Sequence, residues 1–435
     1  MRALLLIAGQ SKRFWPLQEK PLFSLCGQTL IEHQLARLRA AGIQNITLVG
    51  SAANLHIVHT RFPDLPTLEQ EDLSLGMLGA MLSALPACKD ESVLVVSGND
   101  VVDPSAYTAL LQAAHCKDVG GAILARRVNA YFPGGYLTLD GNRVTDIKEK
   151  PGAGNEPSDL VNIVAHVHKN PAALLTALRQ MDPAGDDGYE RGLCSLLPTQ
   201  KYVAVAHEGM WQAVKYPWHL LDLLPHFLSE ITEPCIHSSV SLHASAIVHG
   251  AVVLEEGVRV MPHATIVGPC FVGKNSIIAN NALVRGSSIG RHCVVGYSSE
   301  VKASVLGDHV WMHMSYIGDS TIGNNVSFGG GSVVGNFRLD EQEIHSVVQG
   351  KSIPTGRQKF GTAIGDNCRL GIHTSINPGI KIGGGSFIAS GVLLEEDIPE
   401  HSFVRMRDGK LCQTTNRMTP PQAENRHVFR QNIQQ

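Results

Sequence analysis

The stretch IGDNCRLGIHTSINPGIKIGGGSFIASGVLL (364–394) has an aliphatic residue at every sixth position: Ile364, Leu370, Ile376, Ile382, Ile388 and Leu394. An α-helix buries a position about every 3.6 residues and a half-buried strand about every 2, so neither element explains this period. A six-residue repeat with glycine next to the aliphatic residue indicates short strands stacked as the coils of a solenoid. Each coil then buries one inward row of side chains.

The repeat also occurs upstream, for example at Val272, Ile278 and Val284. It stops between residues 336 and 362, where a polar stretch interrupts the coils and predicts a loop that leaves the solenoid. We therefore predict a parallel β-helix over residues 238–405.

The whole chain has 435 residues, which is too long for one ordinary core and predicts two folded domains and a tail. Its formal net charge is −3 and both signs are spread along the chain, so no concentration of positive charge indicates binding to nucleic acid or an anionic membrane. No apolar stretch approaches the roughly 20 residues that span a bilayer. Nine cysteines without a CxxC pair suggest neither disulfides nor a zinc site, and a reducing, cytoplasmic location fits best.

Residues 1–232 alternate strand-like and helix-like segments, which is the pattern of an α/β domain. Buried strands are expected at 4–8, 46–49, 93–96, 122–124 and 163–167, and helices at 30–41 and 217–228. The change to six-residue repeats places the domain boundary near 232–237, where Pro234 fits a linker. The segment 413–435 is rich in Gln, Asn, Thr and Pro, so we expect a mobile tail.

A short polar turn, AGQSKRFWPLQEKPL (8–22), follows the first predicted strand. Backbone N–H groups in such a turn can bind phosphate oxygens, and Arg13 can neutralise them. Lys20 can stabilise the charge that develops on the α-phosphate of a nucleotide. A solvated basic turn is an equally good explanation of this stretch on its own. However, the segment resembles the GxGTRMxPLT…PK signature of sugar-phosphate nucleotidylyltransferases, with Gly9, Arg13 and Lys20 in matching places and Gln10–Lys12 departing from it.

Further stretches match that family in order. They are Leu75-Gly76 at the nucleobase-reading loop, VVSGNDVVD (95–103) ending in a metal-binding Asp, YFPGGYL (131–137) at the sugar, EKP (149–151), and Val161-Asn162-Ile163. The resemblance implies a Rossmann-like nucleotidyltransferase domain. It also implies that Gly9, Gly76, Gly135, Glu149 and Asn162 bind nucleotide or sugar, and that Asp100 binds Mg²⁺. Taken singly, Glu149 could be a solvated acid and Gly135 part of an ordinary turn.

One segment departs from the family pattern. In WQAVKYPWHLL (211–221), Ala213 stands where a second metal-binding Asp is usual, and Lys215 follows two positions later. Substrate phosphates and water can complete the coordination of Mg²⁺ around one carboxylate, and Lys215 could neutralise the transferred phosphate. Alternatively, the domain has lost turnover and kept only binding.

The repeats of the second domain resemble the left-handed β-helix of hexapeptide-repeat acyltransferases, which implies homotrimers that bind acetyl-coenzyme A. The segments WMHMSYIGDSTIG (311–323) and GGGSVVGNFRLD (329–340) resemble bifunctional N-acetylglucosamine-1-phosphate uridylyltransferase/glucosamine-1-phosphate acetyltransferases, especially those of archaea. By this resemblance His313 is the base of acetyl transfer, and Lys302, Tyr316, Asn336 and Lys359 bind substrate.

A histidine suits that role chemically, because an amine attacks a thioester only when unprotonated and a base with a pKa near the operating pH is needed. The chain has 20 histidines, and a histidine at a coil corner is by default a surface residue. Only the resemblance of the residues around it to the acetyltransferase family distinguishes His313 from the other histidines.

The leading hypothesis is a bifunctional enzyme. It would transfer a nucleotidyl group from a nucleoside triphosphate, with UTP or dTTP favoured, to a sugar 1-phosphate, and an acetyl group from acetyl-coenzyme A to an amino-sugar 1-phosphate. One alternative keeps only the first activity, with the β-helix serving assembly or regulation. Another, motivated by Ala213 and the altered loop at 10–12, is a non-catalytic sugar-nucleotide binder.

Overall fold

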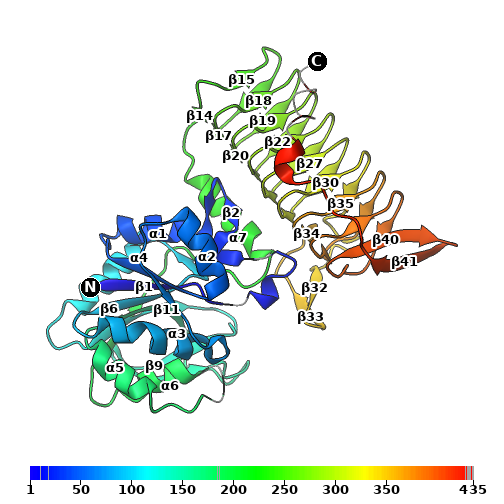
Figure 1. Ribbon diagram of the computed structural model, residues 1–435. Helices are drawn as coiled ribbons and strands as arrows, with labels where there is room; N and C mark the ends of the chain where they lie inside the picture. Colours follow the sequence, from blue (N-terminus) through cyan, green and yellow to red (C-terminus); the bar gives the residue numbers. More distant parts are fainter. Residues whose placement is uncertain are drawn as a thin grey trace. The chain divides into compact units, whose positions relative to one another are not determined.

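The computed structural model describes residues 1–9, 11–17, 19–183, 185, 187–426, 428 and 433. The chain forms two compact units (Figure 1). The first comprises Met1–Gln10 and Ile31–Ala213, and the second comprises Ser11–Leu30 and Val214–Gln435. Most of the predicted phosphate loop therefore belongs to the same unit as the six-residue repeats.

The first unit is a layered α/β structure built on a nine-stranded mixed sheet of order β5-β4-β1-β6-β11-β8-β12-β10-β9. Its strands are β1 (Arg2–Leu6), β4 (Ile46–Gly50), β5 (Thr67–Glu69), β6 (Val93–Ser97), β8 (Gly121–Arg127), β9 (Gly135–Asp140), β10 (Arg143–Glu149), β11 (Leu160–His168) and β12 (Tyr202–Ala206). Strand β1 is parallel to β4 and β6, whereas β11 is antiparallel to β6 and β8. Each of the five predicted strands overlaps one of these.

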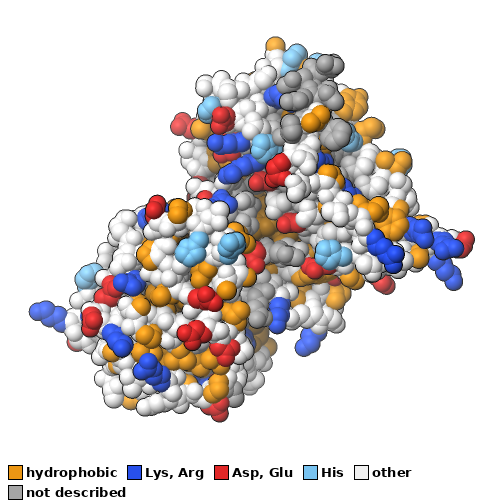
Figure 2. Space-filling view, in the orientation of Figure 1, with side chains coloured by type: hydrophobic (Ala, Val, Ile, Leu, Met, Phe, Trp, Pro, Cys, Tyr) orange, Lys and Arg blue, Asp and Glu red, His pale blue; other side chains and the backbone are white. Residues whose placement is uncertain are grey.

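Helices cover both faces of this sheet. They are α1 (Leu30–Ala40), α2 (Ala52–Arg61), α3 (Gly76–Ala84), α4 (Pro104–Ala114), α5 (Pro171–Leu178) and α6 (Gly188–Cys194). Helices α3, α5 and α6 pack against one face through a shared core cluster that includes Leu78, Leu174 and Leu193, and Figure 1 shows α1 and α4 on the other face. Acidic and basic side chains are interspersed on the visible face of this unit (Figure 2).

The second unit contains the predicted parallel β-helix, made of three sheets. Successive coils add one strand to each sheet, and the last strand of the second sheet is an antiparallel hairpin partner of the strand before it. The first sheet holds β14 (Cys235–Ile236), β17 (Val252–Leu254), β20 (Cys270–Val272), β23 (Ser288–Ile289), β26 (Val305–Leu306), β29 (Thr321–Ile322), β34 (Thr362–Ile364) and β37 (Ile380–Ile382). The second holds β15 (Ser241–Leu242), β18 (Arg259–Val260), β21 (Ile277–Ile278), β24 (Val294–Val295), β27 (Trp311–Met312), β30 (Ser327–Phe328), β35 (Arg369–Leu370), β38 (Phe387–Ile388), β40 (Ser402–Arg407) and β41 (Lys410–Thr415). The third holds β16 (Ile247–His249), β19 (Thr265–Val267), β22 (Leu283–Arg285), β25 (Glu300–Lys302), β28 (Tyr316–Gly318), β31 (Val333–Val334), β36 (Ser375–Ile376) and β39 (Leu393–Leu394).

The six-residue period follows directly from this geometry. Ile364, Leu370 and Ile376 lie on the first, second and third sheet in turn, and all are at most 4% exposed. The corners between the sheets need left-handed backbone, which Asn and His tolerate better than most residues. One corner column consists of Asn275, His292, His309, Asn325 and Asn367, with φ of 55–63°. The many histidines of the chain are partly explained by such corners.

The remaining elements of the second unit are short. They are η1 (Lys12–Phe14), η2 (Lys20–Leu22), the pair β2 (Ser24–Leu25) and β3 (Gln28–Thr29), and α7 (His219–Ser229), which confirms the helix predicted at 217–228. The interruption at 336–362 carries a hairpin of β32 (His345–Val348) and β33 (Lys351–Pro354). Among the described residues, none of the helices is long and apolar enough to cross a bilayer.

The segment predicted as a tail, 413–435, lies partly outside the described residues. Its described part includes the end of β41 and the turn η5 (Ala423–Arg426). Arg426 is 7% exposed, places its guanidinium 4.1 Å from the centre of the Trp311 ring, and donates a hydrogen bond to Ser327 Oγ at 2.7 Å. This arginine fixes η5 onto the second sheet.

Candidate active sites

Three predicted sugar-binding residues lie together in the first unit. Gly135 and Glu149 are cross-strand partners on β9 and β10. A Cβ added to Gly135 would lie 2.8 Å from Glu149 Oε2 and 3.5 Å from the Cβ of Asn162 on β11. A side chain at position 135 would therefore fill the space that Glu149 and Asn162 flank. A carboxylate acceptor and an amide next to a bare backbone can form hydrogen bonds with hydroxyl groups.

Asp100 begins β7 (Asp100–Val102), which pairs antiparallel with β13 (Trp211–Ala213). The register places Ala213 opposite Asp100. Trp211 Nε1 donates a hydrogen bond of 2.9 Å to Asp100 Oδ1, and the Trp211 ring lies 4.9 Å from that of Phe132. The indole thereby fixes the orientation of the Asp100 carboxylate. The motif alone did not reveal this contact.

The donor set near Asp100 is compatible with Mg²⁺ only if the substrate supplies most ligands. Within the described ranges, no three His, Cys, Asp or Glu side chains are grouped so that they could hold a metal ion. Asp103 accepts a hydrogen bond from the Met210 backbone at 2.7 Å, which gives it a structural role. Mg²⁺ often binds one or two carboxylates together with phosphate oxygens and water, so the single carboxylate of Asp100 fits a triphosphate-bound ion.

Two predicted glycines lie at ends of elements in this unit. Gly9 follows β1 and is exposed, with the nearest contact of an added Cβ at 4.0 Å from Asn99 Nδ2. Gly76 begins α3 with a φ of 54°, and its carbonyl accepts a hydrogen bond of 2.8 Å from Gln70 Nε2. Gln70 is buried and also donates to the Asp72 carbonyl, so it organises this loop. Gln70 lies six positions before Gly76 and outside the Leu75-Gly76 motif, so the motif did not indicate this role.

Three predicted cations belong to the second unit. Arg13, in η1, is exposed. Lys20, in η2, is 7% exposed and donates a hydrogen bond of 2.9 Å to the carbonyl of Val214, the residue before Lys215. Lys215 is half-buried, and its backbone N–H donates to His219 Nδ1 at 3.1 Å. Lys20 therefore contacts the backbone next to Lys215, although the two lysines are far apart in sequence.

Three of the predicted acetyl-transfer residues converge on one carboxylate in the β-helix. Asp319 Oδ2 forms an ion pair of 3.0 Å with Lys302 Nζ and accepts a hydrogen bond of 2.6 Å from Asn336 Nδ2. The same amide nitrogen is 3.1 Å from the Tyr316 hydroxyl, to which it donates. We call Lys302, Tyr316, Asp319 and Asn336 the corner cluster. Asp319 lies at its centre, whereas the sequence shows it only as one residue of the 311–323 motif.

The corner cluster depends on close packing between coils. A Cβ on Gly318 would overlap the Tyr316 hydroxyl and come within 2.7 Å of Asn336 Nδ2. Asp319 itself is 4% exposed and has a left-handed φ of 48°. Burial raises the pKa of Tyr316, against the lowering effect of Lys302, so its hydroxyl remains a neutral donor and acceptor near neutral pH.

Of the other two predicted acetyl-transfer residues, His313 lies three positions before Tyr316, and Lys359 pairs with the residue that follows Asn336. His313 is exposed at a coil corner, and its carbonyl accepts a hydrogen bond of 2.8 Å from Ser315 Oγ. Its imidazole has no hydrogen bond to any residue that the structure describes. Lys359 forms an isolated antiparallel β-bridge with Phe337, the residue after Asn336. Its Nζ lies 5.8 Å from the centre of the Phe337 ring.

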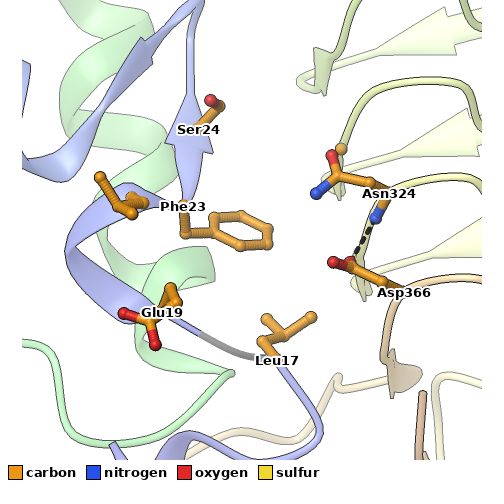
Figure 3. A pocket seen from close by; sticks show the side chains of 8 residues that line it. Leu17, Glu19, Phe23, Ser24, Asn324 and Asp366 are labelled. Atoms are coloured by element: carbon orange, nitrogen blue, oxygen red, sulfur yellow. Dashed lines mark hydrogen bonds between the residues drawn. The ribbon is translucent and has the colours of Figure 1, made fainter. Parts of the chain in front are cut away.

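A pocket of about 170 Å³ lies elsewhere in the second unit, between the 17–24 segment and the β-helix (Figure 3). Glu19 and Asp366 face it, and burial raises the pKa of both carboxyl groups. Asp366 Oδ1 accepts a hydrogen bond from the Asn324 backbone at 2.6 Å. None of the predicted site residues lines this pocket.

Residues 3–236 match the family described as MobA-like NTP transferase domain. A protein named bifunctional protein GlmU from Methanococcus maripaludis is 29% identical over 418 residues, covering 94% of this chain and 98% of the relative. One named bifunctional sugar-1-phosphate nucleotidylyltransferase/acetyltransferase, from Sulfurisphaera tokodaii, is 29% identical over 93% of this chain and 100% of the relative. A solved structure of UDP-glucose pyrophosphorylase from Acinetobacter baumannii has a TM-score of 0.45 and 17% identity, and covers 53% of this chain and 93% of that chain.

Proposed function

Because the chain belongs to the MobA-like NTP transferase domain family, we propose that it transfers a nucleotidyl group from a nucleoside triphosphate to a sugar 1-phosphate. The observation that carries this proposal is the meeting of Gly135, Glu149 and Asn162 in one place. Relatives named for this activity and for acetyl transfer also align over nearly the whole chain.

In the proposed reaction a phosphate oxygen of the sugar 1-phosphate attacks the α-phosphorus of the triphosphate. The bond from that phosphorus to the oxygen bridging the α- and β-phosphates breaks, and pyrophosphate leaves. Arg13 and Lys20 neutralise the phosphates, Lys215 assists them, and backbone at Gly9 and Gly76 positions the nucleotide. Glu149 and Asn162 hold the sugar. UTP and dTTP are the favoured triphosphates.

Asp100 would hold Mg²⁺, with its other oxygen fixed by Trp211. When bound, Mg²⁺ would neutralise phosphate charge and align the reacting oxygens. The position of Ala213 opposite Asp100 favours a second candidate function, in which the chain binds sugar nucleotides without turnover.

For the β-helix we propose acetyl transfer from acetyl-coenzyme A to an amino-sugar 1-phosphate. The amine nitrogen attacks the thioester carbonyl, its proton passes to His313, and coenzyme A leaves as the thiolate, which is then protonated. The corner cluster and Lys359 would bind the acceptor. The exposure of His313 leaves its imidazole accessible to a substrate.

A homotrimer is proposed as the working assembly. Three apolar side chains at coil corners after strands of the second sheet, Tyr297, Met314 and Ile372, are between 52 and 59% exposed. Met314 directly follows His313, so a second copy packed on this row would enclose the proposed base. Light scattering of the full chain tests this assembly.

Both activities can be tested in one experiment. Pyrophosphate release is measured across a panel of triphosphates and sugar 1-phosphates while acetyl-coenzyme A consumption is followed with amino-sugar 1-phosphates. Release without acetyl transfer would leave the β-helix for assembly or regulation. Calorimetric binding of a triphosphate without any release, with and without Mg²⁺, would favour the non-catalytic binder.

A further inference from the structure

A continuous chain of buried polar side chains runs through the first unit and ends at Asn162. Tyr202, His168, Tyr189 and His166 are each 0% exposed, and we call them the relay. The joined atoms are Tyr202 Oη and His168 Nδ1 (2.8 Å), His168 Nε2 and Tyr189 Oη (2.9 Å), Tyr189 Oη and His166 Nδ1 (2.8 Å), and His166 Nε2 and Asn162 Oδ1 (2.7 Å). The proposed chemistry uses none of these four side chains.

Two irregular features of the sheet bring the relay together. In a regular strand, four residues span about 13 Å, too far for Asn162 and His166 to meet. A bulge in β11 pairs the four-residue step from Asn162 to His166 with only two residues of β8, from Ala125 to Ile123. The bulge thereby brings the side chains of Asn162 and His166 within hydrogen-bonding distance. On β8, Gly121 lies between His168 and Tyr202, and a Cβ there would overlap the Tyr202 ring.

Both relay histidines are neutral in the folded protein. Burial lowers the pKa of His166 to about 3, although a hydrogen bond to the Ile163 backbone opposes this, and it lowers the pKa of His168 still more strongly. A neutral imidazole has one donor nitrogen and one acceptor nitrogen. Because Tyr189 has only one hydroxyl hydrogen and contacts both rings, the two tautomers are coupled.

The coupling leaves two directions for the hydrogen bonds. In the inward direction, Tyr202 donates to His168, His168 to Tyr189, Tyr189 to His166, and His166 to Asn162 Oδ1. In the reverse direction, the Tyr202 hydroxyl hydrogen would need another acceptor. Tyr202 has no second hydrogen bond within the described part of the chain, and a buried donor without an acceptor is strongly disfavoured. The inward direction is therefore selected.

The inward direction fixes the amide of Asn162. With Oδ1 held by His166, the amide nitrogen has no hydrogen-bond partner among the described residues. It nevertheless keeps some surface in contact with solvent, because it is not one of the fully buried, unpaired polar atoms. This nitrogen is therefore not fully buried, on a residue that is 8% exposed and flanks Gly135 opposite the Glu149 carboxylate.

We propose that the relay is a positioning device that makes Asn162 a hydrogen-bond donor, never an acceptor, to the sugar 1-phosphate. His166 and Tyr189 are positioning residues, since they act through Asn162. The subsite then offers one donor, at Asn162, and one acceptor, at Glu149, and favours a sugar that presents an oxygen acceptor to the amide. This inference rests on the proposed nucleotidyl transfer for its substrate, but not for the tautomers.

Histidine tautomers can be measured by nitrogen NMR on the full chain with ¹⁵N-labelled histidine and no substrate. We expect two neutral histidines that resist protonation down to about pH 4 and carry their proton on Nε2, with one signal lost in His166→Gln and the other in His168→Gln. A proton on Nδ1 of His166 would overturn the proposal.

Kinetic variants test the consequence for the substrate. Tyr189→Phe keeps the ring and removes the shared hydroxyl, so the KM for the sugar 1-phosphate should rise up to about tenfold while the KM for the triphosphate stays unchanged. Cys88→Ala is the matched control, because it removes a buried polar atom from the same core cluster and should move neither KM. Equal changes in both KM values for Tyr189→Phe would indicate a merely structural role.

The donor itself is tested by comparing two replacements of Asn162. Asn162→Asp still accepts from His166 but loses the donor, so its KM for the sugar 1-phosphate should rise as much as that of Asn162→Ala. Parent-like binding by Asn162→Asp would refute the donor assignment. If the unaltered protein releases no pyrophosphate with any substrate pair, the proposed function fails, whereas the tautomer measurement still decides the direction of the relay.

Discussion

Ala213 lies directly opposite Asp100 across the antiparallel pair of β13 and β7. A carboxylate at position 213 would therefore be a cross-strand neighbour of Asp100, about 5 Å away between Cβ atoms. If Asp100 binds Mg²⁺ as proposed, the backbone thus offers a second position for a carboxylate ligand, which Ala213 occupies.

Replacing Ala213 with Asp should lower the Mg²⁺ concentration needed for half-maximal pyrophosphate release, because a second carboxylate adds a ligand. Ala213→Asn is the control of nearly equal size without the charge. An unchanged Mg²⁺ requirement in Ala213→Asp would mean that Asp100 is not the metal ligand.

Arg13→Ala and Lys20→Ala should each reduce nucleotidyl transfer by about a hundredfold, equivalent to roughly 3 kcal/mol for one preorganised charge contact. Thermal unfolding should separate the two variants. Arg13 is exposed and its loss should leave the melting temperature unchanged, whereas Lys20 is buried on the Val214 carbonyl and its loss should lower it. Near-parent turnover in both would refute their assignment.

Asp319→Asn should weaken binding of the acetyl acceptor, with a KM increase of about tenfold, because Lys302 loses its ion pair. Asn tolerates the left-handed backbone at this corner, so backbone strain does not confuse the result. The measurement is acetyl-coenzyme A consumption against amino-sugar 1-phosphate concentration. A parent-like KM would show that the corner cluster only supports the coil.

His313→Ala should abolish acetyl transfer and leave nucleotidyl transfer close to normal. His313 is an exposed corner residue and is not among the residues proposed for nucleotidyl transfer. His373→Ala, which removes another exposed corner histidine, is the matched control and should retain both activities. Acetylation that persists in His313→Ala would require another base.

The relay predicts how stability depends on pH. The folded pKa of His166 is about 3, below the ordinary 6.5, so its neutral form stabilises the fold fully above about pH 6.5. This stabilisation is lost as the pH falls from about 6.5 towards 3, and a shift of this size corresponds to roughly 4 to 5 kcal/mol. Denaturant unfolding at pH 7 and pH 4 should show a smaller pH effect in His166→Gln than in the parent. An equal effect in both would place the acid sensitivity elsewhere.

The sequence by itself determined the architecture, because periodicity is a local property. The six-residue repeat from Ile364 to Leu394 fixes a coil in which each aliphatic side chain meets the next sheet in turn, and short apolar runs such as 93–96 mark the buried strands of the first unit. Residue types and motif order likewise pointed to Glu149, Asn162, Tyr316 and Asn336 before any contact was known.

Only the tertiary structure decided how these residues are held. Lys302, Asp319 and Asn336 meet because stacked coils superimpose residues about one turn apart, and no pattern within a single coil shows which carboxylate lies at the centre. The relay to Asn162 needs a bulge in β11 and a bare Gly121 on the next strand, which leave no periodic signal. Hydrogen-bond networks depend on distances and directions between segments remote in sequence, and those are fixed by packing rather than by local propensity.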